Sequence, residues 1–246
     1  MIKIASRLLL LGSIGIASLL LVPLERVLPI ALPALIVRLL GTLQPAILMV
    51  AFTALGAWLA PKVGLDAPLV RARIERRPTR PILRHQLSAA IPVGLLAAAV
   101  ILFYDAFYAS ELAVRDASPV AGLEIPLITR ILYGGIVEEL MLRWGAVSLF
   151  VWLMWKASRA GEAIPVWCHW FGMALAALLF AAGHLPLLFS VQSSPSAELV
   201  GAVLIANSAG GMLFGWLFWK RGLEAAVIAH ALAHLFAAAA AAVLLS

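Results

Sequence analysis

Long apolar runs separated by short polar connections fill this chain. A run of about 20 predominantly apolar residues is typical of a helix that crosses the hydrocarbon core of a bilayer, which is about 30 Å thick. The pattern predicts seven spans, at Leu8–Leu24, Gln44–Leu59, Leu87–Tyr108, Ile125–Trp155, Val166–Phe189, Leu199–Trp219 and Ala225–Leu245. We therefore expect an all-α fold, a polytopic transmembrane helix bundle of about seven to eight spans, in which residues 1–246 form a single membrane-embedded domain.

Two apolar runs near the start of the chain need a separate interpretation. Leu8–Leu24 follows Lys3 and Arg7, as in a signal peptide, but no small-residue cleavage site follows it, so the pattern favours an uncleaved anchor. Val27–Thr42 contains two prolines and Arg38, which predicts an interfacial or re-entrant segment rather than a span. If this segment spans after all, the N-terminus lies on the opposite side of the membrane.

The run Ile125–Trp155 is longer than one perpendicular span requires. An α-helix rises about 1.5 Å per residue, so this run exceeds a hydrocarbon core of about 30 Å. We expect the helix to tilt, to break near Gly134 and Gly135, or to project into the cytoplasm.

The composition excludes a soluble globular enzyme. Hydrophobic residues make up 64% of the chain and charged residues 12%, whereas soluble domains have about 45–50% and about 25%. The net charge of +6 comes from residues in connections, so it indicates topology and contact with anionic lipid rather than binding to nucleic acid. Cys168 is the only cysteine, which excludes an intrachain disulfide and a thiolate metal cluster.

The basic residues are distributed unequally between the two sets of connections. Three lie in the connections at one face, namely Arg26, Arg38 and Arg115, and Arg130 and Arg143 lie within a span. The remaining thirteen lie at the other face, which by the positive-inside rule is the cytoplasm. We therefore expect a multi-pass protein of a bacterial inner (plasma) membrane, with a cytoplasmic N-terminus and an external C-terminus.

Two carboxylates and a guanidinium lie within the span Ile125–Trp155. One charged side chain at the centre of a membrane helix costs roughly 3 kcal/mol on insertion scales, so Glu138, Glu139 and Arg143 together indicate a functional site. The i, i+4 spacing predicts an ion pair between Glu139 and Arg143, which leaves Glu138 free to face a cavity. The alternative is that all three form a structural ion network.

Histidines lie in two further spans. His184 is isolated on an apolar helix, where a packing role is the simpler interpretation, and the same holds for His169 among its aromatic neighbours. His230 and His234 are one helical turn apart, which is the spacing of two metal ligands on a helix. Counting residues from the predicted span starts puts His184 towards the outer face, His230 towards the inner face, and Glu138 between them.

Taken in order, the motifs resemble those of the CPBP family of glutamic intramembrane proteases, which includes CAAX prenyl proteases and bacteriocin-processing or Abi-type proteins. The family pattern is Glu-Glu-x-x-x-Arg, Phe-x-x-x-His and His-x-x-x-Asn. Here these motifs are Glu138–Arg143, Phe180–His184 and His230–His234, with His234 in place of the asparagine. The resemblance covers residues 125–237, which we expect to be the catalytic core.

The resemblance implies a role for each motif residue. Glu138 would activate water with assistance from His184, and His230 and His234 would stabilise the oxyanion. Structural support of the site would come from Glu139, Arg143 and Phe180. The family is not regarded as metal-dependent, so no cofactor is expected. The additional histidine nevertheless makes zinc possible through Glu138, His184, His230 and His234.

These expectations describe an intramembrane endopeptidase that hydrolyses a peptide bond of a membrane-associated substrate by glutamate-activated water. The substrate class includes a prenylated tail, a leader peptide and a sorting segment; the expected partners are this peptide or protein and the lipid bilayer, with no nucleic acid. One alternative is a zinc-dependent intramembrane protease, although the usual His-Glu-x-x-His motif is missing. A second alternative is a proton-coupled transporter that uses the same buried cluster; inverted internal repeats would favour it, and the sequence has none that we find. A third is a non-catalytic immunity or scaffold protein.

Overall fold

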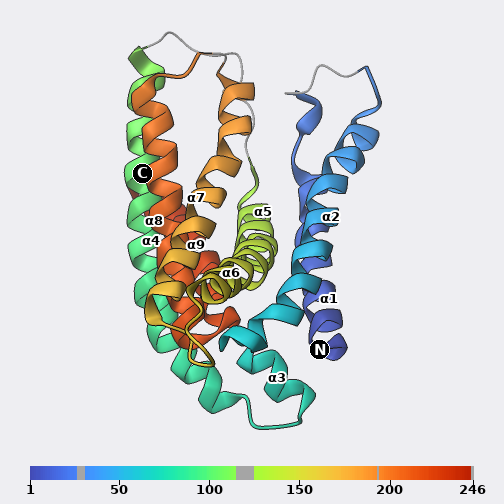
Figure 1. The fold of residues 1–246 in the computed structure, drawn as a ribbon. Helices are drawn as coiled ribbons and strands as arrows, with labels where there is room; N and C mark the ends of the chain where they lie inside the picture. Colours follow the sequence, from blue (N-terminus) through green and yellow to red (C-terminus); the bar gives the residue numbers. More distant parts are fainter. Residues whose placement is uncertain (27–30, 115–124, 193, 245–246) are drawn as a thin grey trace.

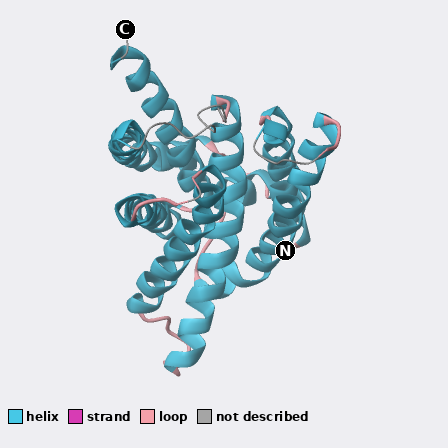
Figure 2. Cartoon of the chain, turned by 90° about the horizontal axis from the view of Figure 1, so that it is seen from above, coloured by secondary structure: helices cyan, strands magenta, loops and turns pink. Residues whose placement is uncertain are grey.

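The computed structural model describes residues 1–26, 31–114, 125–192 and 194–244. Every regular element in these residues is a helix (Figure 1 and Figure 2). The α-helices are α1 (Ile2–Ser18), α2 (Ala34–Leu59), α3 (Pro68–Ile74), α4 (Arg80–Val114), α5 (Leu127–Thr129), α6 (Ser148–Ser158), α7 (Val166–Val191), α8 (Ala197–Arg221) and α9 (Leu223–Leu244). Short 3₁₀ turns occupy Leu19–Leu21, Leu24–Arg26 and Ala60–Val63, and two π-helical stretches, η4 (Arg130–Glu138) and η5 (Leu140–Val147), lie between α5 and α6. The predicted all-α helical bundle is confirmed.

Six helices within the described residues are long and apolar enough to cross a membrane. They are Ile2–Leu21, Ala34–Val63, Arg80–Tyr108, Val166–Ser190, Ala197–Arg221 and Leu223–Leu244, and they correspond to six of the seven predicted spans. The seventh, Ile125–Trp155, is helical from Leu127 to Ser158, because the residues that join α5, η4, η5 and α6 all keep right-handed helical torsion angles. The chain is therefore a multi-pass membrane protein.

The prediction for Val27–Thr42 is wrong from residue 34 onwards. Residues 27–30 lie outside the described part, but Ala34 begins a helix that continues to Leu59, with Pro45 inside it. Pro33 precedes the first helical turn, where a proline interrupts no hydrogen bond. The guanidinium of Arg38 pairs with the carboxylate of Glu25 and donates to the carbonyl of Leu20 at 3.1 Å. Because the same helix contains the predicted span Gln44–Leu59, the number of spans is unchanged.

The helices form two groups with one helix between them. In Figure 1, α1 and α2 form one group, and α4, α7, α8 and α9 form the other. The helix Leu127–Ser158 lies between the groups and crosses them steeply, since it is seen close to its own axis while the others are seen from the side. It contacts both groups, because Trp144 donates a hydrogen bond to the carbonyl of Thr53 on α2 and Arg143 donates one to the carbonyl of Gly211 on α8.

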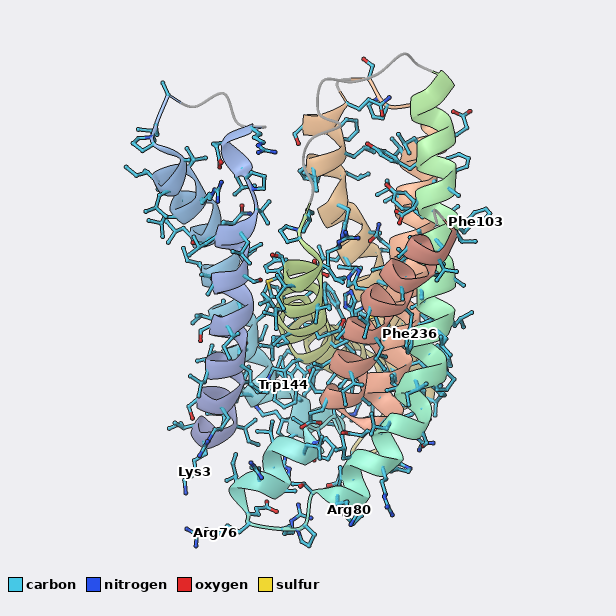
Figure 3. The ribbon with its side chains drawn as sticks, turned by 180° about the vertical axis from the view of Figure 1, so that it is seen from behind. Lys3, Arg76, Arg80, Phe103, Trp144 and Phe236 are labelled. Atoms are coloured by element: carbon cyan, nitrogen blue, oxygen red, sulfur yellow. The ribbon has the colours of Figure 1, made fainter. Side chains whose placement is uncertain are left out.

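Many basic residues gather at one end of the bundle. Figure 3 places Lys3, Arg76 and Arg80 there. The amide of Leu223 donates to the carbonyl of Asp66 at 3.0 Å, so the turn between α8 and α9 lies at the same end. We call this the basic end of the bundle. The positive-inside rule predicts that it faces the cytoplasm.

A labelling experiment tests this orientation. The connection 61–84 holds seven basic residues and resists translocation, so a cysteine at Thr79, introduced after Cys168→Ala, should not react with an impermeant thiol reagent added to intact cells. Leu32→Cys is the control, because Leu32 is exposed and precedes α2, and it should react. Labelling at Thr79 with protection at Leu32 would invert the topology.

Close packing holds Leu127–Ser158 against α2. Trp144 is fully buried, and its Nε1 donates to the carbonyl of Thr53 at 3.2 Å. Gly56, three residues later on α2, meets the same Trp144 so closely that a Cβ atom would overlap with it. The absence of a side chain at Gly56 therefore sets how near the two helices come.

Gly211 and Gly215, four residues apart on α8, lie at the contact with α7. A Cβ atom at Gly211 would lie 2.7 Å from Cβ of Ala177, and one at Gly215 would lie 3.2 Å from Cγ of Met173. The two glycines therefore allow close contact between α8 and α7, as small residues do between membrane helices.

Candidate active site

The predicted break near Gly134 and Gly135 does not occur, because the helix continues through both residues as η4. Instead, the two glycines let η4 approach α9. A Cβ atom at Gly134 would lie 3.0 Å from Nε2 of His234, and one at Gly135 would lie 3.0 Å from Cβ of Ala231. π-Helical hydrogen bonding is rare in proteins, and where it occurs it is frequently found at functional sites. Here it coincides with the residues of the first motif.

Glu139 and Arg143 form the predicted ion pair in the interior of the bundle. Nη1 of Arg143 lies 3.1 Å from Oε1 of Glu139, and the exposed fractions of the two side chains are 2% and 0%. Nη2 of Arg143 donates to the carbonyl of Gly211 at 3.3 Å. The guanidinium also lies 5.1 Å from the ring centre of Phe180 and 5.3 Å from that of Phe214. Arg143 therefore links the first motif to α7 and α8.

His230 connects the two glutamates. Its Nδ1 lies 2.8 Å from Oε1 of Glu139, and its Nε2 lies 3.9 Å from Oε2 of Glu138. A neutral imidazole that donates from Nδ1 to a carboxylate has an unprotonated Nε2. The hydrogen bond to Glu139 thus turns an acceptor nitrogen towards Glu138.

The environments of the two glutamates differ. Glu138 keeps 17% of its side chain accessible, whereas the side chain of Glu139 is fully buried and is held by Arg143 and His230. Glu138 is therefore the less buried carboxylate of the pair. The predicted cavity beside it stays a prediction.

His184 and Phe180 complete the cluster from α7. Nδ1 of His184 lies 2.9 Å from the carbonyl of Phe180, so this nitrogen carries the proton and Nε2 is the free nitrogen of the neutral ring. The ring of Phe180 meets that of His184 edge-on at 4.6 Å and that of His230 edge-on at 6.5 Å. The ring of Phe180 therefore contacts the histidine of its own motif and the first histidine of the third motif.

The different depths predicted for His184 and His230 are wrong. Helix α7 begins at Val166 as predicted and continues through Pro186, so neither a shifted start nor a break explains the contact. Counting residues assumed parallel helices, but the helices are inclined to one another (Figure 1). The inclination brings His230 on α9 to the ring of Phe180, which His184 already contacts within α7.

His234 lies on the same face of α9 as His230. The two imidazole rings stack with centres 5.1 Å apart and an interplanar angle of 29°. Zinc sites need three or four protein ligands that converge on one point about 2.0–2.3 Å away. Within the described residues, no group of three or more His, Cys, Asp or Glu side chains has such an arrangement. Zinc binding at this cluster stays a prediction.

Some features of the site were not singled out from the sequence. Phe214 on α8 stacks on His230 with ring centres 4.5 Å apart and planes inclined by 19°. His169, by contrast, has the predicted packing role. It stacks on Trp219 at 4.7 Å, and its Nε2 lies 3.3 Å from the carbonyl of Val63.

A substitution at Gly134 tests whether the close approach of η4 to α9 positions the histidines. Gly134→Ala should lower turnover by up to about 10²-fold, because its methyl group would lie 3.0 Å from His234 and 3.4 Å from His230 and must displace the rings. Thermal unfolding should change little, since alanine has the higher helix propensity. Gly201→Ala is the control, because a Cβ atom there would meet nothing within 4 Å. Equal activity of the two variants would contradict a positioning role for the glycine.

Residues 121–236 match a protein-family model described as type II CAAX prenyl endopeptidase Rce1-like. The matched segment contains all three motifs and agrees with the family resemblance inferred from them. A search of curated proteins and a search of solved structures each found no match.

Proposed function

We propose that the protein is an intramembrane protease that cleaves by glutamate-activated water, because its residues 121–236 match the Rce1-like type II CAAX prenyl endopeptidase family model. The observation that carries the proposal is the 3.9 Å separation between Oε2 of Glu138 and Nε2 of His230 inside a helix bundle. The substrate is a peptide bond of a membrane-associated peptide or protein. The prenylated tail, the leader peptide and the sorting segment remain the candidate classes.

Glu138 and His230 suit the activation of one water molecule. Hydrogen bonds to oxygen are about 2.8 Å long, so a water beside two atoms 3.9 Å apart reaches both. Glu138 takes a proton from this water while the water oxygen attacks the carbonyl carbon of the substrate. The protonated Glu138 then gives the proton to the departing amine nitrogen when the C–N bond breaks. General-base catalysis of this kind contributes about 10²–10⁴-fold to a rate.

The tautomer of His230 refines its role. With Nδ1–H directed at Glu139, the neutral ring accepts a hydrogen bond at Nε2 and cannot donate one there. Donation to an oxyanion from Nε2 therefore requires the imidazolium form, which the carboxylate of Glu139 would stabilise. His184 also has its proton on Nδ1, so its neutral ring likewise cannot donate a hydrogen bond from Nε2. We propose that both histidines hold the attacking water before they contact the developing oxyanion.

The test is cleavage of candidate membrane-anchored peptides by the purified protein in proteoliposomes, with and without a metal chelator. Product of a defined size, formed at a rate proportional to the amount of protein, supports the proposal. An absence of cleavage across prenylated, leader and sorting peptides, together with proton-coupled uptake of a solute, would favour the transporter alternative instead.

His234 distinguishes the metal-free mechanism from a zinc mechanism. If His234 only donates a hydrogen bond to an oxyanion, His234→Asn should keep much of the activity, because an amide also donates. His234→Ala removes the donor and should cost on the order of 10²–10³-fold in turnover. If His234 binds zinc, both substitutions should be equally damaging. About one zinc per chain in the active protein by elemental analysis, lost together with activity in His234→Asn, would contradict the metal-free mechanism.

A further inference from the structure

A second polar feature lies at the basic end, away from the glutamates. A pocket of about 460 Å³ opens there between the 64–68 connection, the first turns of α4 and the C-terminal end of α8. Its volume falls within the roughly 300–1,000 Å³ of small-molecule sites. The polar side chains that line it are those of Asp66, His85, Lys220 and Arg221. The proposed proteolysis uses none of them.

The lining has an excess of positive charge. The carboxylate of Asp66 is already paired, because Arg71 donates to it from Nη2 at 2.7 Å and from Nε at 2.9 Å. Nε of Arg221 is buried, and no described residue accepts a hydrogen bond from it. The lining therefore carries two cationic side chains, those of Lys220 and Arg221, and one carboxylate that Arg71 already neutralises.

Three lysine–tryptophan pairs mark the depth of this pocket. The ammonium of Lys220 lies 3.3 Å from the ring centre of Trp219, which also lines the pocket. At the same end, the ammonium of Lys62 lies 3.7 Å from the ring centre of Trp58, and that of Lys156 lies 4.4 Å from Trp155.

Contacts between the helices place these pairs near one level. The ring centres of Trp58 and Trp152 are 6.3 Å apart. His169 stacks on Trp219 and also contacts the carbonyl of Val63, the residue after Lys62. Tryptophan concentrates at the headgroup level of a bilayer, and lysine side chains near helix ends reach towards it. The pocket therefore lies where phospholipid phosphates lie.

We propose that this pocket binds the phosphate of an anionic phospholipid headgroup. Lys220 and Arg221, which both line the pocket, supply the positive charge. Basic pockets between membrane helices bind anionic headgroups in this way. The alternative source of the same chemistry is a soluble phosphate ester, and the experiment includes it.

The experiment measures lipid binding to the purified full-length protein by native mass spectrometry in zwitterionic micelles. Phosphatidylglycerol, phosphatidylcholine and glycerol 3-phosphate are titrated separately. Lys220→Gln and Arg221→Gln should each weaken phosphatidylglycerol binding about 5-fold, and the double variant about 30-fold, while phosphatidylcholine binding stays unchanged. Glycerol 3-phosphate should bind far more weakly than the lipid.

Lys156→Gln is the matched control, because it removes the same kind of lysine–tryptophan contact at the same end without changing a residue of the pocket. It should bind phosphatidylglycerol like the wild type. An equal loss in this control, or unchanged binding in the double variant, would overturn the proposal. Tighter binding of glycerol 3-phosphate than of phosphatidylglycerol would make the pocket a site for a soluble ester and would overturn the lipid assignment.

Discussion

Glu138→Gln should lower the rate of peptide cleavage by at least about 10²–10⁴-fold, which is the contribution of a general base. An amide cannot accept the proton of the attacking water. The fold should persist, because glutamine has nearly the same shape and the change removes a charge from the bundle. Glu138 is the choice for this test because it keeps 17% of its side chain accessible and lies 3.9 Å from His230.

The measurement is the initial rate of cleavage in proteoliposomes, with thermal unfolding of the same preparation as the check on folding. Glu162→Gln is the control, since Glu162 is exposed in the connection between α6 and α7, and it should cleave at the wild-type rate. Undiminished cleavage by a folded Glu138→Gln variant would remove Glu138 as the base, and the proposed mechanism with it.

Arg143→Ala should destabilise the protein by about 3–5 kcal/mol, the cost of leaving one partner of a buried ion pair uncompensated. The substitution leaves the fully buried carboxylate of Glu139 without its guanidinium. It also removes the hydrogen bond to the carbonyl of Gly211 and the contacts with two aromatic rings. We expect lower expression, a lower Tm in micelles and loss of cleavage together.

A double-mutant cycle separates the ion pair from these other contacts. Glu139→Gln combined with Arg143→Met removes both charges and keeps the volume of the pair, so the double variant should be more stable than Arg143→Ala. The glutamine can still accept the hydrogen bond from Nδ1 of His230. A double variant as unstable as Arg143→Ala would argue that the ring contacts and the Gly211 carbonyl hold the site, rather than the charge pair.

Features set by local spacing could be predicted from the sequence. Glu139 and Arg143 are one helical turn apart, so their i, i+4 spacing was enough to predict the contact. Apolar runs were enough to predict the spans, because a helix in a bilayer must satisfy its own backbone hydrogen bonds. The start of α2 was missed because Pro33 and Arg38 look unsuitable for a span, whereas both lie within or just before its first turns.

Features set by the inclination of helices could not be predicted in this way. The hydrogen bond between His230 and Glu139 joins residues 91 positions apart, and no periodicity in either helix indicates it. The same holds for the contact between Phe180 on α7 and His230 on α9. The contact of Phe180 with His184 lies within α7 and follows from their i, i+4 spacing. The π-helical form of Arg130–Val147 also has no signal that we found in the residue pattern.

The place of Leu127–Ser158 between two groups of helices has a consequence for biogenesis. The helix that carries Glu138, Glu139 and Arg143 leaves the ribosome after α1, α2 and α4, and domains generally acquire structure from the N-terminus during synthesis. α2 is thus already available to receive Trp144, and His230 arrives last, on α9. The first half of the chain, which lies outside the matched segment, therefore offers a packing surface to Trp144 before α7, α8 and α9, which carry the partners of Glu139 and Arg143, have been made.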